Sequence, residues 1–124
     1  MKNYILKDEG IKYLNSLLNL KIRDFYSYNK IVSKLLKIKT NIPIYIDSNT
    51  IFLPIKAYKA YDCIWLNYKE IDSIIDKKKT VLIKFKNKEI KEFEISLFKL
   101  KRIIKNAQIL INYFVKIECE NVNT

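Results

Sequence analysis

The sequence contains no histidine and only one glycine among its 124 residues. Histidine is the usual general base at neutral pH and a common metal ligand, so its absence argues against most acid–base and metal-dependent enzymes. Phosphate loops and dinucleotide-binding turns need several glycines, which Gly10 alone cannot supply. No spacing that would gather carboxylates around Mg²⁺ is seen among Asp47, Asp62, Glu70 and Asp72. We therefore expect a protein that is not an enzyme, with no cofactor, no metal and no small-molecule substrate.

Cysteine and long apolar runs are also scarce. Cys63 and Cys119 are far apart and lack the C-x-x-C spacing of zinc and redox sites, so we expect reduced thiols, with Cys63 as a small buried residue. No apolar run approaches the ~18 residues that a membrane span needs. The first ten residues, MKNYILKDEG, lack the apolar core of a signal peptide. We expect a cytoplasmic protein that does not bind membranes.

Positive charge is what the sequence has in excess. Lysine and arginine total 24 against 13 acids, which gives a net charge of +11. The excess is concentrated in residues 21–39, 77–91 and 97–106, with net charges of +5, +6 and +4. A localised excess of this size attracts polyanions, of which nucleic acid is the commonest and an anionic membrane the second. Charge therefore indicates a partner, although it says nothing about the fold.

Hydrophobic spacing predicts two helices. The first extends from about Arg23 to Ile38, where apolar residues recur at helical intervals without glycine or proline, and its lysines fall opposite the apolar stripe. The second begins after Ser96, a favourable N-cap, and continues to about Phe114.

Alternating or β-branched runs predict the strands, with a less regular hairpin at residues 3–14 around the turn at 8–10. The expected strands are residues 42–46, 50–53, 62–66, 80–85 and 89–95, with Pro54 ending the second of them. These elements predict a single α+β domain over residues 1–124: an antiparallel sheet of about five strands, a helix before it and a C-terminal amphipathic helix packed on one face. Trp65 is expected to anchor the core.

Cations near the first helix are the favoured candidates for phosphate contact or for insertion into a minor groove. The candidate DNA-binding residues are Arg23, Lys30, Lys34, Lys37, Lys39, Lys56 and Lys59. The competing interpretation is an ordinary solvated surface, and for Lys77, Lys78 and Lys79 it is a charged hairpin edge that discourages aggregation. Tyr58 and Tyr61 alternate with lysine, a pattern that would also suit stacking on unpaired bases.

The order of several motifs resembles the ComK family, the competence transcription factors of low-GC Gram-positive bacteria. The resemblance spans residues 13–114 and rests on the spacing of Pro54, Cys63 and Trp65 and of Phe85, Asn87 and Ser96. It departs where the family's Asn-Gly turn becomes Asn87-Lys88 and where a glycine-rich stretch before the first helix is absent.

The resemblance implies an activator that binds paired A/T-rich boxes of double-stranded DNA, chiefly through the minor groove, as a dimer or higher homo-oligomer. Two alternatives remain open from the residues themselves. One is a basic RNA- or ribosome-associated protein, and the other is an interaction module for an acidic protein partner.

Overall fold

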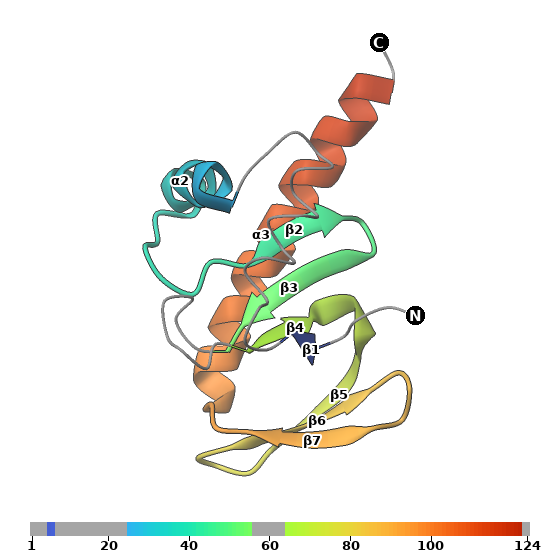
Figure 1. Ribbon diagram of the computed structural model, residues 1–124. Coiled ribbons are helices and arrows are strands. Elements are labelled where there is room, and N and C mark those ends of the chain that lie inside the picture. The colour runs from blue at the N-terminus through green and yellow to red at the C-terminus, as the bar shows by residue number, and fades with distance from the viewer. Residues whose placement is uncertain (1–4, 7–24, 56–63, 123–124) are drawn as a thin grey trace.

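The computed structural model describes residues 5–6, 25–55 and 64–122, and their side chains over 27–55 and 64–117. It confirms the predicted α+β class (Figure 1). In chain order the elements are β1 (Ile5–Leu6), α2 (Phe25–Leu36), β2 (Ile44–Asp47), β3 (Thr50–Pro54), β4 (Trp65–Asn67), the 3-10 turn η1 (Tyr68–Glu70), β5 (Ile71–Asp76), β6 (Val81–Phe85), β7 (Ile90–Phe93) and α3 (Leu97–Val122).

The strands form two antiparallel sheets, so the expectation of one sheet of about five strands is wrong. One sheet has the order β1-β4-β3-β2 and the other the order β5-β6-β7. The chain passes between them at η1, where the buried Asn67 side chain acts as the cap. Its Oδ1 accepts the N–H of Lys69 at 3.2 Å and that of Ile51 at 3.3 Å. A buried amide thus ends β4 and turns the chain into the second sheet.

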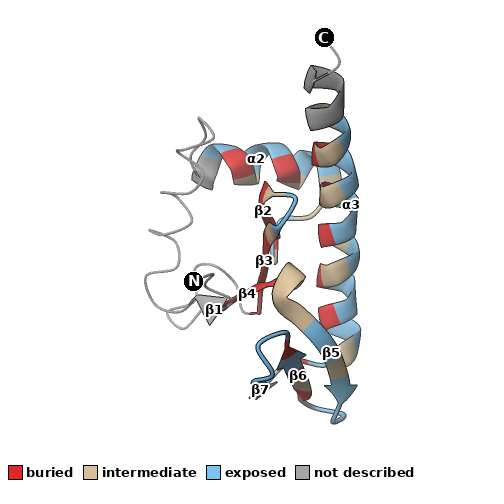
Figure 2. Cartoon of the chain, turned by 90° about the vertical axis from the view of Figure 1, so that its right-hand side faces the viewer, coloured by how far each residue is buried: buried red, intermediate tan, exposed pale blue. Residues whose placement is uncertain are grey.

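The four-stranded sheet is buried on both faces. Successive residues of a strand point to opposite faces, yet Ile51, Phe52 and Leu53 are all fully buried. The predicted C-terminal helix, α3, lies along one of these faces (Figure 2). Trp65 on β4 is buried, which confirms it as a core residue. The ladder also continues past Pro54, because the N–H of Ile55 donates to the carbonyl of Ile64 at 2.8 Å.

The three-stranded sheet has one buried and one exposed face. Val81, Ile83 and Phe85 alternate with less buried residues along β6, as predicted for the β6–β7 hairpin. Strand β5 was not predicted. A register shift between Ile71 and Ser73 breaks its two-residue alternation, so the sequence IDSIID does not look like a strand.

Both helices differ from the prediction at their ends. The N–H of Lys99 donates to Ser96 Oγ at 3.2 Å, which confirms the cap, but α3 continues to Val122. Helix α2 stops at Leu36, before the predicted end at Ile38. Lys37 takes a left-handed conformation with φ of 57°, and the N–H of Ile38 donates back to the carbonyl of Ser33 at 3.2 Å. This 6→1 bond is the Schellman way to end a helix, here without glycine.

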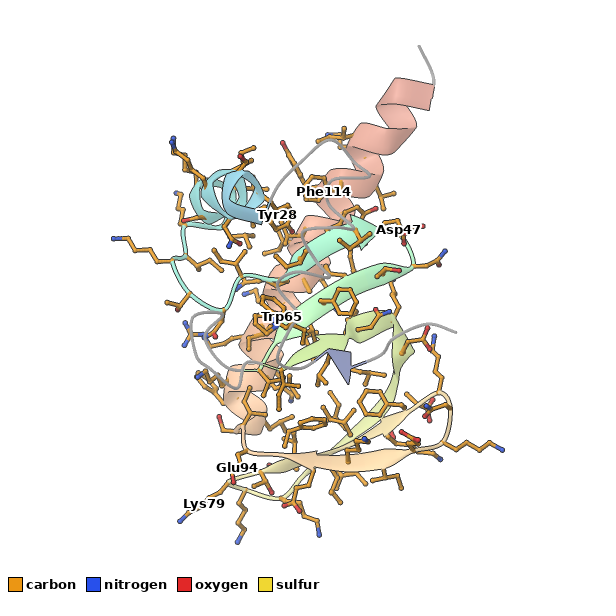
Figure 3. All side chains as sticks on the ribbon, viewed as in Figure 1. Tyr28, Asp47, Trp65, Lys79, Glu94 and Phe114 are labelled. Atoms are coloured by element: carbon orange, nitrogen blue, oxygen red, sulfur yellow. The ribbon has the colours of Figure 1, made fainter. Side chains whose placement is uncertain are left out.

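Helix α2 lies across α3 at the end of the four-stranded sheet (Figures 1 and 2). The ring of Phe114 on α3 stacks on Tyr45 of β2 at 4.8 Å and on Tyr28 of α2 at 6.2 Å between centroids. Figure 3 shows Tyr28 and Phe114 together at this junction. Strand β1 pairs with β4, whereas the predicted turn at residues 8–10 lies outside the described residues, as does Cys63.

Candidate functional site

Acids are unevenly distributed between the helices and the second sheet. We use the name basic helix pair for α2, the loop at residues 37–41, and α3 as far as residue 117. Its sequence contains nine cations and no acid. The cations are Lys30, Lys34, Lys37, Lys39, Lys99, Lys101, Arg102, Lys105 and Lys116, and all of them are exposed. Within the part of the chain that is described, none of them has a carboxylate at ion-pair distance.

The second sheet contains acids as well as lysines, although one of the three basic segments of the sequence, residues 77–91, lies in it. Residues 69–94 contain eight lysines but also six acids. Figure 3 shows Lys79 and Glu94 at the same end of this sheet. The high charge of residues 77–91 is therefore offset in space by acids from β5 and β7, which weakens the field that a polyanion would meet.

The structure places four of the seven predicted site residues. Lys30 and Lys34 are exposed on α2, while Tyr28 and Val32 on the same helix are buried, so the predicted opposition of basic and apolar faces is confirmed there. Lys37 and Lys39 follow the helix and belong to the loop. Three predicted site residues and both predicted stacking tyrosines lie outside the described residues: Arg23, Lys56, Lys59, Tyr58 and Tyr61.

The outer face of α3 was not among the predicted site residues. Residues 98, 102, 105, 109 and 116 follow one another at helical intervals on the side opposite the buried Leu100, Ala107 and Phe114. This row contains three cations and two exposed apolar residues, Phe98 and Ile109. The complete absence of acids from residues 97–117 was the available sequence signal, but an exposed phenylalanine is indistinguishable from a core residue until the helix is placed.

A cavity of about 370 Å³ lies between the loop at residues 37–41 and the first half of α3. Its lining includes Asn41 from the loop and Phe98, Lys99, Arg102 and Asn106 from the helix. Left-handed backbone at Lys37 and Asn41, with φ of 57° and 55°, shapes this loop. The fold thereby brings the loop that contains Lys37 and Lys39 to the segment of α3 that contains Lys99 and Arg102.

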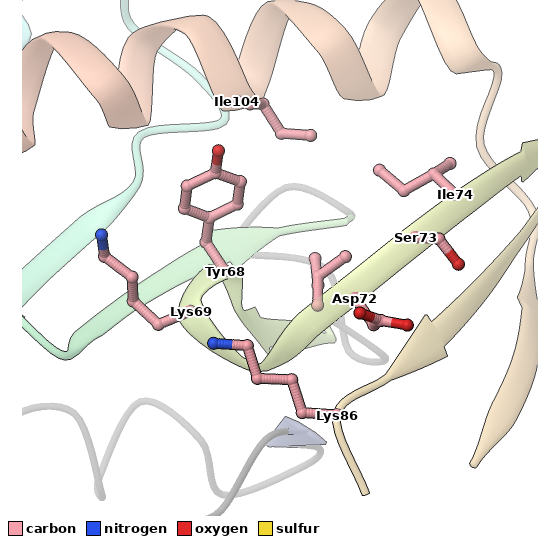
Figure 4. Close-up of a pocket in the computed structure, with 8 residues that line it drawn as sticks. Tyr68, Lys69, Asp72, Ser73, Ile74, Lys86 and Ile104 are labelled. Atoms are coloured by element: carbon pink, nitrogen blue, oxygen red, sulfur yellow. The ribbon is translucent and has the colours of Figure 1, made fainter. Parts of the chain in front are cut away.

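A second cavity, of about 460 Å³, lies between α3 and the start of β5. Figure 4 shows Lys69 and Lys86 on one side of it, Asp72 on the other and the Tyr68 ring below Ile104. The hydroxyl of Tyr68 accepts a hydrogen bond from Gln108 Nε2 at 3.2 Å, which ties η1 to α3. The carboxylate makes this cavity less attractive to an anion than the acid-free one.

Among the described residues, no helix has the length and apolar character needed to cross a bilayer. In the same ranges, no three side chains of histidine, cysteine, aspartate or glutamate gather as a metal site would require.

Comparison with known proteins identifies a family. A family model described as ComK protein matches residues 3–117, which is nearly the whole chain and includes both sheets and most of α3. No curated protein and no solved structure matches the chain.

Proposed function

Because the chain belongs to the ComK family of competence transcription factors, we propose that it is a regulator that binds double-stranded DNA through the basic helix pair. The observation that carries this proposal is that the basic helix pair, residues 25–41 and 97–117, has nine exposed cations and no acid. Lysines placed in this way neutralise phosphates and release counterions, which gives strong, salt-dependent affinity without reading sequence.

The proposed target is A/T-rich DNA approached from the minor groove. A/T tracts narrow this groove and deepen its negative potential, so it favours cationic side chains inserted from the protein. Arg102, with its exposed guanidinium on α3, is suited to this role. We further propose that the chain acts as a homo-oligomer, because two copies would double the phosphate contacts on a paired site.

Fluorescence anisotropy at several salt concentrations tests the proposal, with an A/T-rich duplex, a G/C-rich duplex and a structured RNA as probes. We expect preference for the A/T-rich duplex and affinity that falls steeply as salt rises. A preference for RNA would instead support a ribosome-associated protein. Indifference to all three probes would point to an acidic protein partner and would contradict the proposal.

A further inference from the structure

Phe98 has the most exposed large apolar side chain in the described part of the molecule, with 74% of its surface accessible. Phenylalanine is normally buried, and an exposed ring gains free energy when another surface covers it. The exposure does not come from an unravelled helix end, because Ser96 caps the first turn of α3 through the N–H of Lys99. The fold therefore holds this ring outward at a fixed position.

The surroundings of the ring are cationic. Arg102, one turn along α3, places its guanidinium carbon 6.0 Å from the ring centroid, a cation–π arrangement. Lys99 and Arg102 line the adjacent cavity together with Asn41 and Asn106, and its lining contains no carboxylate. Few surfaces complement an apolar ring set among positive charges. A DNA duplex does, since it is apolar between its stacked bases and anionic along its edges.

We propose that Phe98 inserts between neighbouring base pairs of bound duplex and kinks it, while Arg102 lies in the minor groove beside the ring and Lys99 holds a phosphate next to the opened step. The inference rests on the DNA binding proposed above and names a residue and a mechanical effect that binding alone does not require. Proteins that approach the minor groove often use an apolar wedge in this way, with the cost of unstacking offset by the extra contacts that bent DNA makes.

An apolar protein partner fits the same residues less well. The next exposed apolar residue on this face of α3 is Ile109, and Lys105 lies between it and Phe98 along the row. A single ring bordered by cations is too small an apolar patch for a protein interface, which usually needs several hundred Å². Charge complementarity thus favours nucleic acid as the partner of the ring.

Ligase-catalysed circularisation of an A/T-rich duplex of ~150 bp, about one persistence length, measures bending without knowledge of the target sequence. Each protein is used at a concentration that saturates the duplex by anisotropy. We expect the wild-type chain to raise the yield of circles and Phe98→Ala to return it to the protein-free level. Phe98→Lys should also lose bending although it adds a cation, whereas Phe98→Leu should retain part of it because leucine can act as a wedge.

Ile90→Ala is the matched control, because Ile90 is also exposed, at 59%, but lies on β7. It should change neither affinity nor circularisation. If wild-type protein binds duplex and Phe98→Ala bends it as strongly as wild type does, the proposal that Phe98 acts as a wedge is wrong, while the proposed DNA binding stands. If wild-type protein binds no duplex, both fail. If it binds single-stranded DNA more tightly and Phe98→Ala removes that preference, the ring stacks on unpaired bases and the wedge is again wrong.

Discussion

The phenol oxygen of Tyr28 accepts a hydrogen bond from the backbone N–H of Tyr45 at 2.8 Å, although the two residues are seventeen positions apart in the chain. The same oxygen donates its proton to the carbonyl of Pro43, also at 2.8 Å. Strand β2 is the edge of its sheet, so these outward-facing backbone groups have no neighbouring strand. The Tyr28 hydroxyl therefore makes the hydrogen bonds that a further strand would otherwise make, and it fixes α2 to the sheet.

Replacing Tyr28 with phenylalanine should destabilise the fold by about 2–3 kcal/mol, because it leaves a buried N–H and a buried carbonyl without this partner. Urea denaturation measures the change as a lower midpoint with an unchanged slope. Tyr113→Phe is the control: Tyr113 is 40% exposed and its hydroxyl has no hydrogen bond within the described residues. Equal stability of Tyr28→Phe and wild type would show that the hydroxyl does not secure the helix.

The buried amide of Asn67 should be similarly important. Its Oδ1 accepts two backbone N–H groups, one on β3 and one in η1, so it holds the end of one sheet at the start of the other. Asn67→Ala should cost about 2–4 kcal/mol in urea denaturation, since both donors lose this acceptor in a buried site. Asn112→Ala, at an exposed position of α3, should be neutral or slightly stabilising. If Asn67→Ala leaves the free energy of unfolding unchanged, water replaces the amide oxygen as acceptor.

Lysine occupies backbone positions that normally favour glycine. In the β6–β7 hairpin the N–H of Lys88 donates to the carbonyl of Phe85 at 2.9 Å, and Lys88 itself is left-handed with φ of 73°. A residue with a Cβ pays about 1 kcal/mol for this conformation. Lys88→Gly should therefore raise the thermal midpoint, by about 4 °C per kcal/mol gained at this chain length.

Lys86→Gly provides the contrast within the same hairpin. Lys86 is not among the residues with positive φ, so glycine there adds only flexibility to the unfolded chain and should lower the midpoint. Both variants remove one cation, so a difference between them cannot come from charge. If both shift the midpoint in the same direction, the backbone conformation at Lys88 is not the cause.

The elements that sequence predicts well are those whose signal is local. Alternation along β6 and the Ser96 cap are visible in adjacent residues, and both agree with the structure. The division into two sheets depends on which strands pair, for example Leu53 with Leu66, and such pairings join residues that are distant in the sequence. Burial of both faces of the first sheet likewise depends on which elements cover it.

The candidate site shows the same limit. Helical spacing correctly predicts the exposed positions of Lys30 and Lys34. Lys37 instead lies after the end of the helix in a left-handed conformation, which the presence of a lysine does not predict. Phe98 has a side chain of a type that is normally buried, and its place on α3 exposes it. The loop after α2 lies close to α3 because of tertiary packing, which the local sequence does not predict.

Neutralising cations in three matched sets should reveal which surface meets DNA. The sets are Lys30, Lys34 and Lys39→Gln in the first part of the basic helix pair, Lys99, Lys101 and Lys105→Gln on α3, and Lys77, Lys78 and Lys79→Gln in the β5–β6 turn. Each removes three charges from exposed positions. The left-handed Lys37 is kept, and the left-handed Lys78 is replaced by glutamine, which also has a Cβ and therefore has a similar cost in this conformation. For every lysine that contacts a phosphate, the slope of log affinity against log salt should become shallower by about 0.9.

We expect both sets in the basic helix pair to weaken duplex binding and reduce this slope, and the β5–β6 set to change them little, because acids of the second sheet already offset its lysines. Circular dichroism should be the same for all four proteins, since none of the nine side chains is buried. An equal loss in all three sets would mean that affinity follows net charge alone, so that no particular surface is the interface. A loss confined to the β5–β6 set would move the interface to the second sheet.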